Sequence, residues 1–237
     1  MDISDDTIRN AVMQTEILRA PKQSLYTFGT TNINYYLLTR PAYPDAGAPA
    51  GAPTETVVRE GKVVAERPRI VTPYYLSRLE GFSGEARRYF EALIKEFGPQ
   101  SSGMLYTYRN EPGGLNIISE DMRLVIEKIN AEIDQRGDQL AAIIRGEDLL
   151  WDVSLLKFIF EVTRNSVGDN VQQMGQRGLL GVDSRGIPAD ARVRIEEMFH
   201  KVTGGELEPR QLKDELDRWD VFDEYQDRFL ALFRKGR

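Results

Sequence analysis

The most apolar stretch of the chain runs from Leu149 to Val162 and reads LLWDVSLLKFIFEV. Ten of its fourteen residues are apolar, so winding it as a helix leaves only a thin polar stripe. Most of the circumference of such a helix needs to be covered by other protein. We therefore predict that this helix lies at the centre of the core and packs against the segments that precede and follow it in the sequence.

Helical spacing of apolar residues dominates the chain after residue 118. We expect a helix over residues 119–137, a short helix over 138–145, and further helices that open at Pro188 and Pro209. The glycine-rich stretch 168–188 has no sustained period and predicts a connector. The last helix carries an apolar stripe made of Phe222, Tyr225, Phe229, Leu230 and Phe233. The second half of the chain is thus expected to be all-helical.

Several segments before residue 118 are rich in β-branched and aromatic residues, which is typical of strands. Residues 25–39 predict a hairpin or two neighbouring strands. Two valine-rich arms around Glu60-Gly61 predict a further hairpin, and residues 104–119 predict another with its tip at Pro112 to Gly114. Helices are expected before Pro21 and over residues 83–97, where helical spacing replaces the strand pattern.

These elements predict an α+β fold, with an antiparallel sheet and flanking helices in residues 1–118 and an all-helical part in residues 119–237. The strand, helix, strand alternation that parallel crossovers require is absent, which disfavours a doubly wound sheet. Proline, alanine and glycine fill residues 44–54, where we expect a flexible surface loop. We expect the helical part to pack on the first part as one unit.

Composition narrows the classes of function. The 237 residues include no cysteine, which excludes disulfides and thiolate metal sites and fits a reducing cytoplasm. The N-terminus lacks the pattern of a signal peptide, and no run approaches the roughly 20 apolar residues of a membrane span. We expect a soluble, cytoplasmic protein without a membrane partner.

The charge of the chain is acidic and unevenly distributed. The net charge is −6, and residues 101–237 hold 25 acidic against 19 basic side chains. Because phosphate neutralisation supplies most non-specific affinity for nucleic acids, this balance disfavours a nucleic-acid partner. The first 100 residues are balanced, with 12 side chains of each sign, so a local basic patch remains compatible with the sequence.

Motifs that resemble catalytic or metal-binding patterns are incomplete. Glu197-x-x-His200 has the spacing of a di-iron ligand pair, but the chain has one histidine and such sites need two. Ser154-x-x-Lys157 matches the motif of penicillin-interacting serine enzymes without its companion motifs. The glycines of residues 181–186 lack the following lysine of a phosphate-binding loop. We assign no catalytic residue, metal or cofactor, and whether the protein is an enzyme stays open.

One basic and aromatic region is a candidate ligand site. Residues 59–88 hold seven Arg and Lys against four Glu, with two tyrosines in the middle. Arginines beside aromatic rings can hold a phosphate or carboxylate and stack a base. The alternative is that these arginines pair with glutamates along a solvated sheet edge. The candidate ligand-binding residues are Arg67, Arg69, Tyr74, Tyr75 and Arg78.

Two functional hypotheses follow. The first is a non-catalytic interaction or regulatory protein that acts through its helical half on another protein or on a second copy of itself. Its candidate contacts are the aromatic residues Trp219, Phe222, Phe229 and Phe233, which packing within one chain would also explain. The second is a binding protein or enzyme for an anionic or nucleotide-like small molecule, which would use the region from Arg59 to Arg88.

Overall fold

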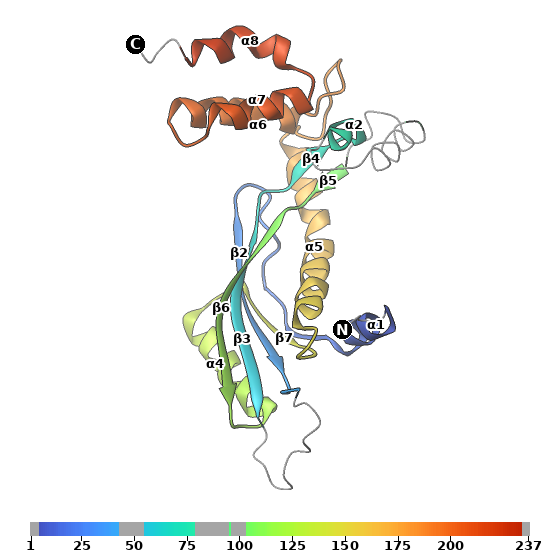
Figure 1. The fold of residues 1–237 in the computed structure, drawn as a ribbon, viewed down its shortest axis with the longest axis vertical. Helices are drawn as coiled ribbons and strands as arrows, with labels where there is room; N and C mark the ends of the chain where they lie inside the picture. The colour runs from blue at the N-terminus through green and yellow to red at the C-terminus, as the bar shows by residue number, and fades with distance from the viewer. Residues whose placement is uncertain (1–4, 43–54, 79–94, 96–102, 234–237) are drawn as a thin grey trace. The chain divides into compact units, whose positions relative to one another are not determined.

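A computed structural model describes residues 5–42, 55–78, 95 and 103–233 (Figure 1). The loop expected over residues 44–54 lies outside the described residues, as does nearly all of the helix expected over 83–97. In the parts of the chain that the structure describes, no helix combines the length and the apolar character needed to cross a bilayer.

The chain forms two compact units, each assembled from two separate stretches. Unit 1 comprises Met1–Arg67 and Tyr106–Asn170, and unit 2 comprises Pro68–Leu105 and Val171–Arg237. Each core is therefore made by segments that are distant in the sequence. The two units are described separately below.

Unit 1 is built on a five-stranded sheet with the strand order β1-β7-β2-β3-β6. The strands are β1 (Glu16–Arg19), β2 (Thr31–Thr39), β3 (Thr56–Ala65), β6 (Tyr108–Ile118) and β7 (Ala141–Arg145). All neighbouring strands are antiparallel except β2 and β7, which are parallel. The predicted α+β class is confirmed, but the sheet is mixed rather than wholly antiparallel.

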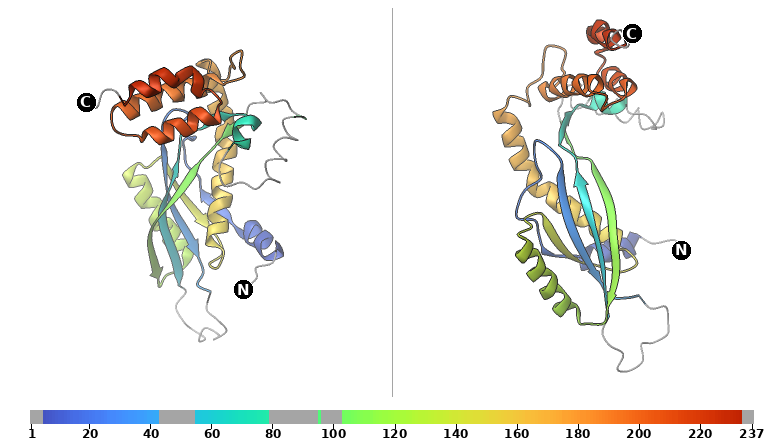
Figure 2. Two further views of the ribbon diagram at one scale, coloured as in Figure 1. Left: turned by 45° about the horizontal axis from the view of Figure 1, so that its top comes forward. Right: turned by 90° about the vertical axis from the view of Figure 1, so that its left-hand side faces the viewer.

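Two helices cover opposite faces of this sheet, as Figures 1 and 2 show for α4 (Met122–Arg136) and α5 (Trp151–Gln176). Successive residues of a strand point to opposite faces, so β2 contributes to both cores. Ile33, Tyr35 and Leu37 pack with Leu155, Phe158 and Val162 of α5. Tyr36 and Leu38 pack with Val125, Ile129 and Ile133 of α4.

The short helix expected over residues 138–145 is wrong, because Ala141–Arg145 form strand β7. The first four residues of β7 are buried, and β7 lies between β1 and β2 with helices on both faces of the sheet. A strand buried on both faces reads as a continuous apolar run. Such a run cannot be distinguished from a buried helix by periodicity alone.

Two predicted hairpin tips are also wrong. Glu60-Gly61 lies inside β3 and Pro112 to Gly114 lies inside β6, and the two strands pair with Gly61 opposite Pro112 beside an irregularity in the register. These glycines allow close approach rather than a turn. A Cβ atom on Gly113 would lie 2.9 Å from the carbonyl oxygen of Glu60, and one on Gly61 would collide with the ring of Tyr35.

The ends of the predicted helices shift to different degrees. Helix α1 (Asp5–Gln14) ends early, since residues 16–19 form β1. Helix α5 continues to Gln176, into the stretch expected to be a connector. Helix α4 ends at Gly137 as predicted, and this residue caps the helix in the left-handed conformation with φ 66°.

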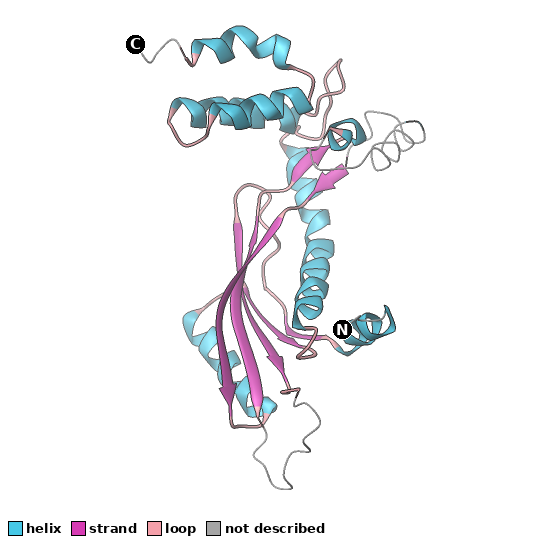
Figure 3. Cartoon of the chain, viewed as in Figure 1, coloured by secondary structure: helices cyan, strands magenta, loops and turns pink. Residues whose placement is uncertain are grey.

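Unit 2 consists mainly of helices (Figure 3). A two-stranded antiparallel sheet pairs β4 (Arg69–Val71) with β5 (Gly103–Leu105), and α2 (Pro73–Ser77) follows β4. Helices α6 (Ala189–Thr203) and α7 (Pro209–Arg218) begin next to the prolines that predicted them, and α8 (Phe222–Ala231) follows. The core of the unit includes Tyr75, Phe199, Leu216, Trp219 and Phe229.

Replacing a buried residue of α5 tests this packing. Phe158 is fully buried and Phe160, on the same helix, is 65% exposed. We expect Phe158→Ala to lower the free energy of unfolding by about 3–5 kcal/mol through the cavity it leaves. The matched variant Phe160→Ala should change it by less than about 1 kcal/mol in dilute solution. Denaturant unfolding measures both, and similar losses for the two variants would contradict the orientation of α5.

Candidate functional site

The five residues predicted to bind a ligand do not converge on one site. Arg67 belongs to unit 1, where its guanidinium carbon lies 5.8 Å from the centre of the Phe28 ring. The other four residues belong to unit 2. The arginines and tyrosines that the sequence predicted to form one cluster therefore belong to two different units.

Two of the four residues in unit 2, Tyr75 and Arg69, interact with other side chains of that unit. Tyr75 is buried, its ring centre lies 4.5 Å from that of Trp219, and its hydroxyl donates to Glu215 at 3.0 Å. Burial raises the pKa of Tyr75, and the charge of Glu215 raises it further. Arg69 lies near Arg194, whose pKa is lowered first by burial and then by the charge of Arg69.

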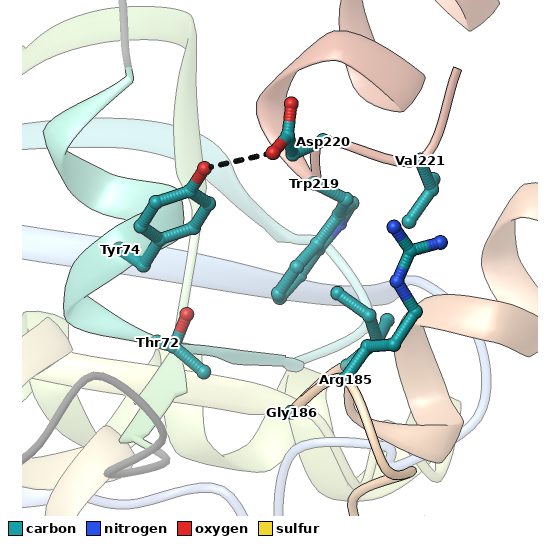
Figure 4. A pocket seen from close by; sticks show the side chains of 8 residues that line it. Thr72, Tyr74, Arg185, Gly186, Trp219, Asp220 and Val221 are labelled. Carbon is teal, nitrogen blue, oxygen red and sulfur yellow. Dashed lines mark hydrogen bonds between the residues drawn. The ribbon is translucent and has the colours of Figure 1, made fainter. Parts of the chain in front are cut away.

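Tyr74 and Arg78 do come together. Tyr74 also lines a pocket of about 240 Å³ (Figure 4). The guanidinium carbon of Arg78 lies 4.6 Å from the centre of the Tyr74 ring. Three segments form the pocket: α2 with the residue before it, the turn before α6, and the junction between α7 and α8. Its lining residues are Thr72, Tyr74, Arg185, Gly186, Ile187, Trp219, Asp220 and Val221.

Local hydrogen bonds fix two of these segments. The side chain of Thr72 caps α2 by accepting from the amide of Tyr75. In the turn before α6, the carboxylate of Asp183 accepts from the amides of Arg185 and Ile187 at 2.9 and 3.0 Å. Burial raises the pKa of Asp183, but these bonds and those from Arg192 outweigh burial and hold the pKa below its usual value. Only the later part of the glycine-rich stretch 168–188 is therefore a connector, since α5 extends to Gln176 and residues 183–187 form this turn before α6.

In the third segment, Asp220 occupies the position after the end of α7 at which glycine is the usual residue. The amide of Val221 donates to the carbonyl of Leu216 at 3.0 Å, and the amide of Asp220 donates to that of Asp217 at 3.1 Å, which together make a Schellman motif. Asp220 has φ 58° and is the only non-glycine residue with positive φ among those described. Its backbone therefore occupies the conformation that glycine adopts with least strain.

The carboxylate of Asp220 reaches back to α2. It accepts a hydrogen bond from the Tyr74 hydroxyl at 3.3 Å (Figure 4). It accepts another from Nη1 of Arg78, also at 3.3 Å. Burial raises the pKa of Tyr74, the charge of Arg78 opposes this shift, and the charge of Asp220 adds to it. The Tyr74 hydroxyl therefore stays protonated and remains a donor at neutral pH.

The pocket presents aromatic surface, one guanidinium and one carboxylate, which suits binding of a flat polar molecule. Among the described residues, no group of three or more acidic or histidine side chains is placed to hold a metal ion. Sequence reasoning missed Arg185 and Asp220, because each lies more than 100 positions from Tyr74 and neither forms part of a local motif.

The Ser154-x-x-Lys157 motif has a structural role in unit 1. Ser154 is fully buried, and its hydroxyl lies 2.7 Å from that of Thr15. The amine of Lys157 donates to the carbonyls of Val12 and Thr15 at 3.0 and 2.8 Å. These bonds join the end of α1 to α5, and the hydroxyl of Ser154 is buried away from solvent. His200 is exposed on the surface of α6.

A second candidate site lies on the side of α5 that faces away from the sheet. Leu149 in the preceding turn is 78% exposed, and Leu156, Phe160 and Val167 are 64%, 65% and 37% exposed. Each residue of a helix turns by about 100°, so Leu156 and Phe160 both point nearly opposite to Phe158. We name these four residues the outer stripe. Protein therefore covers most of this helix, as expected, since ten of residues 149–162 are buried or partly buried, but the side left exposed is mainly apolar rather than polar.

No protein-family model, curated protein or solved structure matches the chain. The candidate functional features are therefore the outer stripe of α5 in unit 1 and the pocket beside Asp220 in unit 2.

The strained position of Asp220 yields a stability prediction. Asp220→Gly and Asp220→Ala remove the same carboxylate contacts, but only alanine keeps a Cβ atom in the left-handed conformation. We expect the glycine variant to have the higher free energy of unfolding, by about 1 kcal/mol. Denaturant unfolding compares the two proteins directly. Equal stability would contradict the left-handed conformation of this residue.

Proposed function

We propose that the protein is a non-catalytic interaction protein that acts through its helical part, by pairing the outer stripe of α5 with the same stripe of a second copy. The exposure of Leu149, Leu156 and Phe160 is the observation that carries this proposal. Leucine and phenylalanine side chains are stabilised by roughly 1.5–3 kcal/mol when they are buried. A stripe of such side chains in water therefore favours association.

The size of the stripe supports an interface. From their exposed fractions, the four side chains present on the order of 400 Å² of apolar surface, which is comparable to the largest patches of ordinary monomers and often functional. Pairing two copies would bury this area twice, together with polar side chains at its rim. Twice the exposed area is about 800 Å² before the rim is counted, which falls in the range below about 1,200 Å² that weak and transient interfaces occupy.

The spacing of the stripe supports a second copy as the partner. Leu149, Leu156, Phe160 and Val167 are separated by seven, four and seven residues, so the pattern is symmetric about position 158. A two-fold symmetric interface needs a patch that is complementary to itself. In an antiparallel pair of helices, Leu156 would face Phe160 of the partner, and Leu149 would face Val167 of the partner.

Neighbouring residues extend and border this surface. Met13, which is 66% exposed, follows Val12, whose carbonyl is bonded to Lys157 of α5. Asp152 and Arg164 are exposed on either side of the stripe and provide a polar rim of the kind that surrounds apolar interface centres. Of the aromatic residues first considered for contacts, Trp219 and Phe229 are buried in the core of unit 2 and Phe222 is partly buried against it, whereas Phe233 is 58% exposed.

The pocket of unit 2 favours ligand binding as a second candidate function. It combines Tyr74, Arg185 and Asp220 around one cavity, which suits a polar aromatic or nucleotide-like molecule. Of the residues proposed from the sequence, Tyr74 lines this cavity and Arg78 supports it.

Charged substitutions in the stripe test the proposed pairing. We expect light scattering to report a dimer for the unaltered chain at micromolar concentration. Leu156→Glu combined with Phe160→Glu should weaken the dimer at least tenfold, because two carboxylates on each copy would be buried without partners. Leu124→Glu is the control, since Leu124 is 52% exposed on α4, outside the stripe. A double variant that dimerises like the control would refute the proposal.

Crosslinking tests the orientation of the two helices, because the chain has no cysteine of its own. Leu156→Cys and Phe160→Cys chains, mixed in equal amounts and oxidised, should form mainly the mixed disulfide if the helices are antiparallel. Disulfides need Cα atoms within about 7 Å, so only facing positions react efficiently. Predominance of the two symmetric disulfides would instead indicate a parallel pair.

A further inference from the structure

A carboxylate and a guanidinium, those of Asp220 and Arg185, line the same pocket. We propose that it binds a guanine base, with Asp220 accepting from the donor edge of the base and Arg185 donating to its acceptor edge. This site lies in unit 2, and the proposal does not depend on pairing through α5.

The hydrogen-bonding capacity of Asp220 fits two further donors. Its two oxygens each accept one bond, from Tyr74 and from Arg78, and each oxygen of a carboxylate has a second lone-pair site. The side chain is 68% exposed, so these sites are accessible. A carboxylate with two vacant acceptor positions suits a ligand with adjacent N–H groups, which guanine presents at N1 and N2.

Arg185 supplies the complementary donors. Within the described residues, its side chain is bonded through Nη1 to the carboxylate of Glu224, and a guanidinium carries five N–H donors. Arginine binds the O6 and N7 atoms of guanine through two parallel hydrogen bonds, which is the commonest specific contact to this base. The carboxylate of Asp183 accepts hydrogen bonds from the amides of Arg185 and Ile187, and these bonds hold the backbone of Arg185 in place before any ligand binds.

Charge and ring contacts discriminate among bases. Adenine has an acceptor nitrogen at the position of the guanine N1–H group. This nitrogen and the carboxylate of Asp220 are both acceptors, so no hydrogen bond would form between them. A site built to accept hydrogen bonds rejects a ligand that lacks the donors, because its polar groups are left unpaired. The half-buried ring of Tyr74 provides a stacking surface for a flat base, with Arg78 fixing its position.

The volume of the pocket limits how much of a ligand it can enclose. About 240 Å³ lies below the range of 300–1,000 Å³ that is usual for whole drug-sized ligands. The pocket therefore suits the base, and a sugar would remain outside. Ligand binding would explain why an aspartate occupies this left-handed position. Glycine would end α7 with less strain, but it would supply no hydrogen-bond acceptor.

Tryptophan fluorescence tests the proposal, because Trp219 lines the pocket and Trp151 is the only other tryptophan. In full-length Trp151→Phe protein, titration with guanosine should quench the emission saturably, with a Kd below about 1 mM. Adenosine should bind at least tenfold more weakly. Asp220→Gly and Arg185→Ala should each weaken guanosine binding at least tenfold, whereas Asp223→Asn, an exposed carboxylate outside the pocket, should leave it unchanged.

Several outcomes of these titrations would contradict guanine binding at this pocket. Absence of saturable quenching by guanosine up to several times the expected Kd would overturn the proposal, as would equal affinity for guanosine and adenosine. Unchanged binding by a folded Asp220→Gly protein would remove the assigned role of the carboxylate. The stripe variant with Leu156→Glu and Phe160→Glu should bind guanosine as the unaltered chain does, so a failure of one proposal is distinguishable from a failure of the other.

Discussion

The contact between α5 and the five-stranded sheet is the interaction on which the rest of unit 1 depends. Leu155, Phe158 and Val162 cover one face of the sheet, and α4 covers the opposite face. Because both faces are covered, β7 can be apolar along most of its length. The same helix fastens α1 through Ser154 and Lys157. Once these contacts are made, the opposite side of α5 has no neighbour in the sheet, and its apolar residues remain in water.

Two apolar faces on one helix explain why the sequence misleads about α5. Its composition correctly predicts a long buried helix, and Phe158 is fully buried as expected. Composition alone does not distinguish a helix enclosed within one chain from a helix that has a core face and an exposed apolar face. The distinction depends on what packs against Leu156 and Phe160, and that is decided by tertiary structure.

The sequence predicts the α+β class and the helices α4, α6 and α7, because capping residues, prolines and apolar periodicity act locally. It does not predict β7, or the uninterrupted course of β3 and β6, because these depend on pairing between distant strands. Of the residues that line the candidate pocket, only Tyr74 belongs to the predicted set, and Arg78 of that set contacts the ring of Tyr74. Asp220 and Arg185 join them through folding, and an aspartate at the end of a helix gives no local signal of a ligand site.

The central claim is that the outer stripe of α5 is an interface between two copies of the chain. Sedimentation equilibrium of the unaltered protein over a hundredfold range of concentration tests it most directly. The account predicts a reversible equilibrium between monomer and dimer, with the dimer dominant at the highest concentration. A single species with the 27.0 kDa mass of the monomer throughout that range would contradict it.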